Sequence, residues 1–216
     1  QGPYAVPHLV GMLASRDPEP LLFALQSLSR IGHAAAAPAI LPLLHHSDPN
    51  VAQAAIEATG KLRIQEAVPA LCGLLQRDLW LQLAAIAALG DIGHPDAVKP
   101  LMAFVPDSIL AEPAVQALRR IAAPESLEPL APLLLSVRER SLRDPLLLAV
   151  AVVIDLHPDP EPMLRRMERD VVVDGGNLAT YLGQLLAAPP GEGDAEESDS
   201  LLRAATTVVA AAGIAE

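Results

Sequence analysis

EAVPALCGLLQRDLWLQLAAIAALGDIG, residues 66–93, is the stretch that decides the fold. Pro69 stands near its start, Asp78 opens its second half, and Ile92 with the turn residue Gly93 closes it. Most of the other residues are Ala, Leu and Ile, and small aliphatic residues of this kind suit closely packed helices. Two apolar segments of helical length, separated by a polar turn with a capping aspartate, predict a helical hairpin.

The same landmarks recur on both sides of this stretch. The prolines near the start of each unit are 31 residues apart, at Pro7, Pro38, Pro69 and Pro100. The aspartates that open the second half are spaced by 31, 30 and 29 residues, at Asp17, Asp48, Asp78 and Asp107. We expect the two slips to fall in the loop inside each hairpin, because loops tolerate changes of length. A fixed period of this length predicts a stack of repeated units.

The second unit shows why each half is expected to be helical. APAILPLLHH, residues 37–46, places Pro38 near the first turn of a helix, where its missing N–H costs nothing. SDPN, residues 47–50, combines a capping Ser or Asp with a proline at the first helical position. The apolar residues that follow have the spacing of an amphipathic helix: Val51, Ala54, Ala55, Ala58 and Leu62. Neither helix could bury its apolar face alone, so the units must stack.

Glycines support close stacking. Gly60 and Gly90 occupy one column of the repeat, where the missing Cβ lets neighbouring helices approach closely.

The pattern D-x-A-V-x-x-L-x-x-x-L followed by D-P-x-V-x-x-A-A-x-x-A-L-G-x-I-G resembles the short HEAT-like repeats that also occur in phycobilisome lyase subunits and in deoxyhypusine hydroxylase. The resemblance covers four units over residues 4–123 and a fifth over residues 125–157. It implies an all-α, right-handed solenoid of stacked antiparallel helical hairpins. Such repeats commonly carry an Arg four residues after the loop Asp, but that column contains Leu21, Ala52, Gln82 and Ala111. Stacking should therefore depend more on apolar packing.

The two ends of the chain depart from the repeat. Gln1-Gly2-Pro3 matches the end of a site cut by picornaviral 3C proteases, so we interpret residues 1–3 as a remnant of a cleaved tag. We expect the repeats, about five units, to occupy residues 4–157. Residues 158–216 are expected to form a degenerate sixth unit or a C-terminal cap. Within them, residues 189–200 carry five carboxylates and almost no apolar side chain, which predicts a flexible acidic loop.

Composition excludes several classes of function. The net charge of −11 opposes binding to nucleic acids, whose partners usually present a basic stripe. The sequence has neither an apolar run long enough to span a bilayer nor a signal peptide, so we expect no membrane partner. The single cysteine, Cys72, cannot form an internal disulfide, which agrees with a reducing, cytoplasmic location.

The reactive side chains do not converge on a catalytic, metal or cofactor site. His33 and His94 share a column but are two repeats apart, about 20 Å at the usual spacing of packed helices. No Cys, Asp or Glu stands at a ligand spacing from the adjacent His45 and His46. No His-Glu dipeptide is present, so the iron site of deoxyhypusine hydroxylase does not carry over. Cys72 lies in an apolar column and is interpreted as a small buried residue. We therefore expect no enzyme activity and no cofactor.

A candidate binding surface follows from two columns of the second helices, which line the concave face of such a stack. The positions two and five residues after the loop Asp hold Glu19 and the seven residues that we predict to bind a protein: Trp80, Leu83, Ile109, Leu22, Gln53, Asn50 and Glu112. A solvated face would not be expected to combine Trp80, Leu83 and Ile109. Packing of Trp80 against a neighbouring unit is the alternative interpretation.

The predicted function is a non-enzymatic protein–protein interaction scaffold, excised from a larger bacterial protein, that binds another protein or peptide segment on its concave face. Two alternatives belong to different classes. The chain could be an accessory or chaperone-like subunit of an enzyme, as lyase subunits are, or it could be a homodimerisation module.

Overall fold

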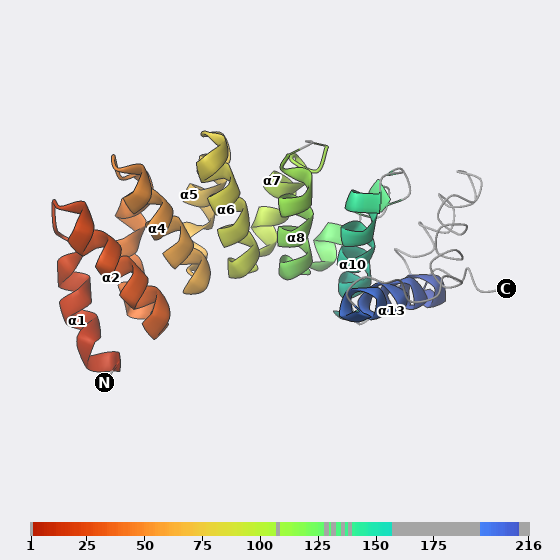
Figure 1. Cartoon of the computed structure of the whole chain (residues 1–216), viewed down its shortest axis with the longest axis horizontal. Helices are drawn as coiled ribbons and strands as arrows, with labels where there is room; N and C mark the ends of the chain where they lie inside the picture. Colours follow the sequence, from red (N-terminus) through yellow and green to blue (C-terminus); the bar gives the residue numbers. More distant parts are fainter. Residues whose placement is uncertain are drawn as a thin grey trace. The chain divides into compact units, whose positions relative to one another are not determined.

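The computed structural model describes residues 2–106, 109–127, 130, 133–134, 137, 140–156 and 195–211. The chain forms two compact units, Gln1–Leu101 and Met102–Glu216, and each is described by itself. All regular structure in the described ranges is helical. The fold is the predicted α-solenoid of helical hairpins, and the helix boundaries follow the repeat (Figure 1).

The first unit contains three hairpins and the first half of a fourth. Its elements, with η for 3-10 helices, are α1 Gly2–Met12, α2 Pro18–Ile31, η1 Ala34–Ala36, α3 Ala37–Ile40, η2 Leu41–His45, α4 Pro49–Lys61, η3 Gln65–Ala67, α5 Val68–Leu74, α6 Leu79–Ile92, η4 Pro95–Ala97 and α7 Val98–Met102. The second helices form one layer, in which α2 contacts α4 and α4 contacts α6. Of the first helices, α1 packs against α2 and α5 packs against α6 (Figure 1).

The first half of the second hairpin is not one continuous helix. The sequence predicts a helix over residues 37–46, but the structure divides the segment into α3 and the 3-10 helix η2. Pro42 lies in η2, and a proline inside a helix lacks the N–H and crowds the preceding turn. A tighter 3-10 winding over these residues accommodates it.

The second unit continues with α8 Ala111–Ile121, η5 Pro124–Ser126, α10 Arg140–Leu156 and α13 Ala195–Ala211, and α10 contacts both α8 and α13. The predicted acidic loop over residues 189–200 is wrong for residues 195–200, which form the start of α13. Ala and Glu are good helix formers, and carboxylates near a helix N-terminus interact favourably with its dipole. Residues 189–194, and the rest of the predicted cap between 158 and 194, lie outside the described residues.

Three of the four loop aspartates, Asp17, Asp48 and Asp78, directly precede their helices as predicted, but they do not cap them equally. Asp107 lies outside the described residues, and α8 has Leu110 at its N-cap position. Asp48 Oδ1 accepts hydrogen bonds from the backbone N–H groups of Asn50, at 2.8 Å, and Val51, at 3.4 Å. Asp78 Oδ1 accepts from Leu81 N–H at 3.2 Å. Asp17 stands at the same place before α2, and its side chain makes no capping hydrogen bond. The position of the aspartate in the repeat therefore predicts where the helix starts, while the capping hydrogen bonds differ from one repeat to the next.

This difference gives a matched pair of substitutions. We expect Asp48→Ala to lower the free energy of unfolding by about 1 kcal/mol, because two backbone donors lose their acceptor. Asp17→Ala should cost no more than a few tenths of a kcal/mol, since it removes only the interaction of the charge with the helix dipole. Urea denaturation followed by circular dichroism measures both variants. Equal losses would contradict a role for the capping bonds.

The core lies between the layers and repeats with the sequence. The column seven residues after the loop Asp is fully buried at Ala24, Ala55 and Ala85, and the column eleven residues after it at Leu28, Thr59 and Leu89. Contact between α4 and α6 is close at Gly60, as the sequence predicts. A Cβ on Gly60 would lie 2.9 Å from Ala88 Cα and 3.2 Å from Ala88 Cβ. Apolar packing of small residues thus holds successive hairpins together.

Candidate binding groove

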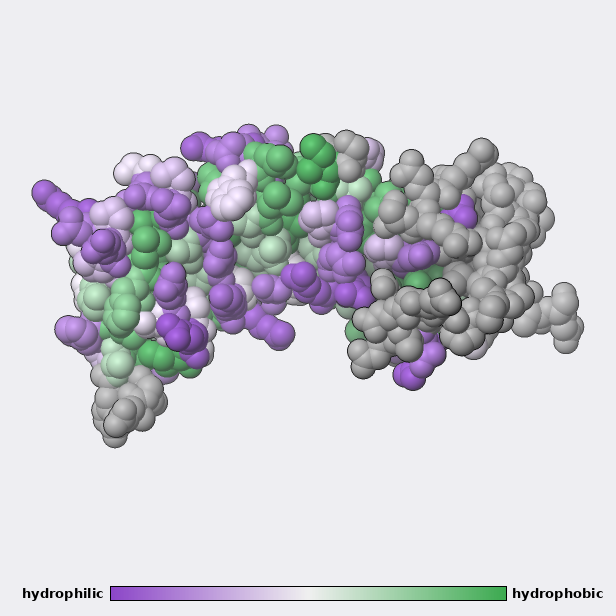
Figure 2. Space-filling model, viewed as in Figure 1, coloured by the Kyte–Doolittle hydropathy of each residue, from purple (hydrophilic) through white to green (hydrophobic). Residues whose placement is uncertain are grey.

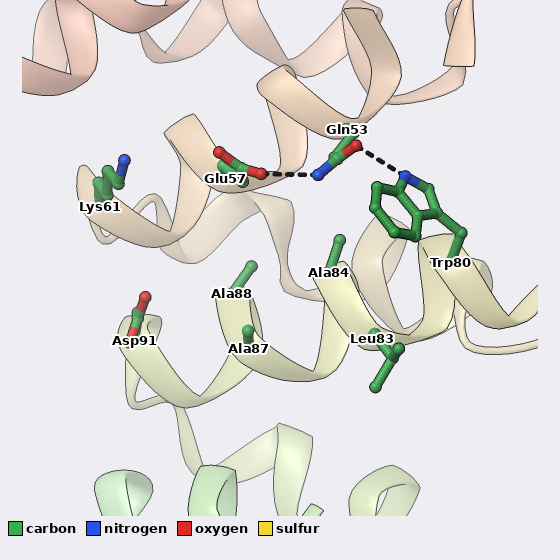
Figure 3. Close-up of a pocket in the computed structure, with 9 residues that line it drawn as sticks. All are labelled: Gln53, Glu57, Lys61, Trp80, Leu83, Ala84, Ala87, Ala88 and Asp91. Carbon is green, nitrogen blue, oxygen red and sulfur yellow. Dashed lines mark hydrogen bonds between the residues drawn. The ribbon is translucent and has the colours of Figure 1, made fainter. Parts of the chain in front are cut away.

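A groove with a volume of about 360 Å³ runs between α4 and α6 in the first unit. One wall belongs to α4 and consists of residues four apart, which lie in one row along a helix: Gln53, Glu57 and Lys61. The other wall belongs to α6 and extends over the same length: Trp80, Leu83, Ala84, Ala87, Ala88 and Asp91 (Figure 3). Two successive repeats therefore contribute one wall each.

Trp80 stands at one end of the groove and is held by a chain of hydrogen bonds. Its side chain is 61% exposed. Its indole Nε1–H donates to Gln53 Oε1 at 2.7 Å, and Gln53 Nε2 donates to Glu57 Oε1 at 2.9 Å (Figure 3). The Glu57 carboxylate accepts from the amide nitrogen, which turns the amide oxygen of Gln53 toward Trp80. The ring is thus oriented by its polar edge, while most of its surface stays open to solvent.

The two walls differ in polarity. On the visible face of the first unit, a hydrophilic strip over α4 lies beside a more hydrophobic strip over α6 (Figure 2). The middle of the α6 wall consists of Leu83, Ala84, Ala87 and Ala88. The alanines are small, so a ligand could approach the helix backbone closely. At the end opposite Trp80, Lys61 and Asp91 place one charge of each sign on facing walls (Figure 3).

The structure brings three of the seven predicted binding residues together, because Trp80, Gln53 and Leu83 line one groove. Leu22 on α2 is half-buried, and Asn50 is exposed in the first turn of α4. Ile109 is 61% exposed just before α8, and Glu112 is exposed in the first turn of α8; both belong to the second unit. Trp80 also contacts the neighbouring repeat, because its indole N–H bonds Gln53 of α4, while the residue stays 61% exposed.

Sequence reasoning missed six residues of the groove: Glu57, Lys61, Ala84, Ala87, Ala88 and Asp91. A signal was available for four of them. The positions nine and thirteen residues after the loop Asp lie on the same helix face as the positions two and five residues after it. These columns contain Glu57 with Ala87, and Lys61 with Asp91. The bond between Trp80 and Gln53 joins residues 27 positions apart, and no local pattern indicates it.

The histidines near the loops have a structural role. The Nδ1 atoms of His33 and His94 each accept the backbone N–H two residues further on, at 3.2 Å in both cases. His46 Nδ1 accepts from Asp48 N–H in the same way at 3.0 Å. Each ring therefore stabilises the start of the next helix. In the described part of the chain, no three His, Cys, Asp or Glu side chains are grouped closely enough to hold a metal ion.

Cys72 on α5 is half-buried, so it is less enclosed than the sequence predicts. Burial raises the pKa of its thiol, and the Asp96 carboxylate raises the pKa further. A raised pKa leaves less of the nucleophilic thiolate at neutral pH.

We therefore expect iodoacetamide to alkylate Cys72 more slowly than a free cysteine at neutral pH, with a rate that rises through a pH midpoint above that of the free thiol. Asp96→Asn should shift this midpoint downward only slightly, because burial is the larger cause. Mass spectrometry of samples quenched across a pH series measures the rate. A midpoint below that of free cysteine would contradict this assignment.

None of the described helices is long and apolar enough to cross a bilayer.

Comparisons with known proteins agree with the repeat. A family model described as HEAT repeats matches residues 6–81, and a model of the PBS lyase HEAT-like repeat matches residues 81–105. No curated protein matches the chain significantly.

Among solved structures, an engineered protein from a structural genomics consortium is similar, with a TM-score of 0.62 and 22% identity, over 95% of this chain and 97% of that one. Computationally designed armadillo repeat proteins for modular peptide recognition are also similar, with a TM-score of 0.61 and 20% identity, over 94% of this chain and 99% of that one.

Proposed function

This chain is a HEAT-like repeat protein, and we propose that it is a non-enzymatic interaction scaffold that binds a protein or peptide segment in the groove between α4 and α6. The observation that carries the proposal is Trp80, an exposed tryptophan whose orientation is fixed by Gln53. Tryptophan is among the residues most enriched at binding hot spots. Its surroundings are apolar on the α6 side, so a partner that covers the ring would also bury Leu83 and the alanines.

Preorganisation favours this function. The ring and the Gln53 side chain are already ordered, so a partner would not have to immobilise them when it binds. A similar solved fold was designed for modular peptide recognition, which agrees with the same use here. We infer that contacts extend from the groove to Asn50 and Leu22 on the same layer of second helices in the first unit, whereas Ile109 and Glu112 remain candidate binding residues of the second unit by itself.

A pull-down with the full chain, analysed by mass spectrometry, tests the function. The matched pair is Trp80→Ala and Phe23→Ala, because the two aromatic side chains are 61% and 58% exposed and only Trp80 lines the groove. We expect a specific partner to be retained by Phe23→Ala and lost from Trp80→Ala. With the partner purified, Trp80→Ala should weaken binding by about 30-fold or more, the usual effect of a hot spot.

Circular dichroism of both variants checks that they fold. A partner that both variants retain would place the function elsewhere on the chain, and the absence of any specific partner would contradict the scaffold function itself.

A further inference from the structure

We propose that the segment bound in this groove is an amphipathic helix that lies parallel to α4 and α6 and carries a Lys or Arg beside its apolar stripe. The inference rests on the proposed function and specifies the partner. It is drawn from the length of the groove, from the hydrogen-bonding groups of its walls and from its charges.

The groove follows the helix axes. Its α6 wall extends from Trp80 to Asp91 and its α4 wall from Gln53 to Lys61. At 1.5 Å per residue, the α6 wall is about 16 Å long, which corresponds to three helical turns. A helix in this groove would place side chains at positions i, i+3 or i+4, and i+7 against the walls, as ridges of one helix pack into the groove between others. The alanines at 84, 87 and 88 leave room for these side chains.

Hydrogen bonding distinguishes a helical from an extended ligand. An extended segment exposes backbone N–H and C=O groups, and these lose free energy if they are covered by a surface that cannot bond to them. The middle of the α6 wall, Leu83 to Ala88, contains no polar side chain among its lining residues. The one side-chain amide of the groove, on Gln53, bonds Trp80 through its oxygen and Glu57 through its nitrogen. It retains one N–H and one lone pair, which are too few for the row of backbone groups that an extended segment would expose. A helix bonds its own backbone, so it can cover the apolar wall without this cost.

The charges at the Trp80 end favour a cation. Glu57 Oε1 accepts from Gln53, and its second oxygen accepts no hydrogen bond within the described part of the chain. Gln53 links this carboxylate to the exposed Trp80 ring, and ring faces attract ammonium and guanidinium groups. A Lys or Arg there would meet a carboxylate and an aromatic face together, with its aliphatic stem along the wall. The opposite end, with Lys61 and Asp91, has no net charge, and the net charge of the chain is −11.

A random peptide library displayed on phage tests the inference. Peptides of about 14 residues are long enough for three helical turns with ends to spare. The full chain is the target, and clones that also bind the Trp80→Ala variant are removed. We expect the remaining sequences to have apolar residues at i, i+3 or i+4, and i+7, with Lys or Arg next to that stripe. Enrichment of alternating or proline-containing sequences, enrichment of acidic sequences, or no groove-dependent sequence would overturn the inference.

One synthetic peptide with the enriched pattern then tests the geometry and the charge. Replacing a central residue of the peptide by proline should weaken binding at least 10-fold, because proline interrupts a helix. Glu57→Gln should weaken binding about threefold to tenfold, whereas Glu66→Gln, an exposed carboxylate in η3 outside the groove, should leave it unchanged. Fluorescence reports binding directly, because Trp80 is the one tryptophan of the sequence. Equal affinities for the proline peptide, or equal effects of the two Glu variants, would overturn the inference.

The two proposals fail in different ways. If the pull-down finds a partner that depends on Trp80 while the library yields extended or acidic peptides, the scaffold function stands and the helical, basic ligand is wrong. If no partner depends on Trp80, the proposed function is wrong.

Discussion

Leu89→Ala should lower the free energy of unfolding by about 2–5 kcal/mol, the range found when a fully buried leucine is truncated. Leu89 is 0% exposed on α6, a helix that packs against both α4 and α5. Its equivalents Leu28 and Thr59 are buried in the same column of the preceding repeats. The repeat has no arginine in the column where related repeats have one, so apolar contacts carry the stacking. A cavity at Leu89 would therefore weaken the contact of the third hairpin with the second.

Leu83→Ala on the same helix is the control for this prediction. Leu83 is half-buried in the groove, so its truncation should cost about 1 kcal/mol or less in stability. It should weaken partner binding, whereas Leu89→Ala should leave affinity unchanged in the fraction that remains folded. Urea denaturation, followed by circular dichroism for the whole chain and by Trp80 fluorescence for the first unit, measures the stability. If Leu89→Ala and Leu83→Ala lowered the free energy of unfolding equally, burial in the core column would not explain the loss of stability.

Gly60→Ala should destabilise the first unit although alanine is the better helix former. The added Cβ would meet the backbone of Ala88 at 2.9 Å, so α4 and α6 would have to move apart. Overpacking of this kind costs about 1–3 kcal/mol, and the gain of about 1 kcal/mol in helix propensity offsets part of that cost. We expect a net loss of stability of up to about 2 kcal/mol.

Gly73→Ala provides the matched control, because Gly73 is helical and exposed in α5 and an added Cβ there would meet nothing within 4 Å. It gains the same propensity without the clash, so it should stabilise the protein by up to about 1 kcal/mol. The two variants should thus differ by about 1–3 kcal/mol, a difference in which the propensity gain cancels. Two variants of equal stability in urea denaturation would contradict close contact at Gly60.

Much of the fold could be predicted because most repeats contain the same landmark residues at the same helix boundaries. Asp48 and Asp78 precede α4 and α6 in the structure, and Gly32 and Gly93 end their helices in the left-handed conformation, with φ of 72° and 75°. Gly60 occupies a column whose close approach follows from the stacking of equivalent helices. These positions depend on local propensity and on periodicity, both of which a single sequence contains.

The parts that could not be predicted depend on single residues or on contacts between repeats. Pro42 interrupts a helix that the apolar pattern alone would continue. The acidic residues 195–200 resemble a solvated linker in composition, yet they begin α13, which packs on α10. In the groove, the columns identified Trp80, Leu83 and Gln53, but a column does not say which neighbours bond to one another. The link from Glu57 through Gln53 to Trp80 is a property of two repeats in contact.

The hydrogen-bonded link from Glu57 through Gln53 to Trp80 relates ligand binding to the spacing of the two hairpins. Its two ends belong to successive hairpins, so the 2.7 Å bond between Trp80 and Gln53 depends on the separation of α4 and α6. A partner bound in the groove, as proposed above, would favour the separation seen in the structure and would make the contact between the two hairpins stiffer. By reciprocity, a load that pulls the hairpins apart must weaken the partner's affinity by the same free energy. We therefore expect a stack of repeats with such a groove to bind its ligand less tightly when the hairpins are pulled apart.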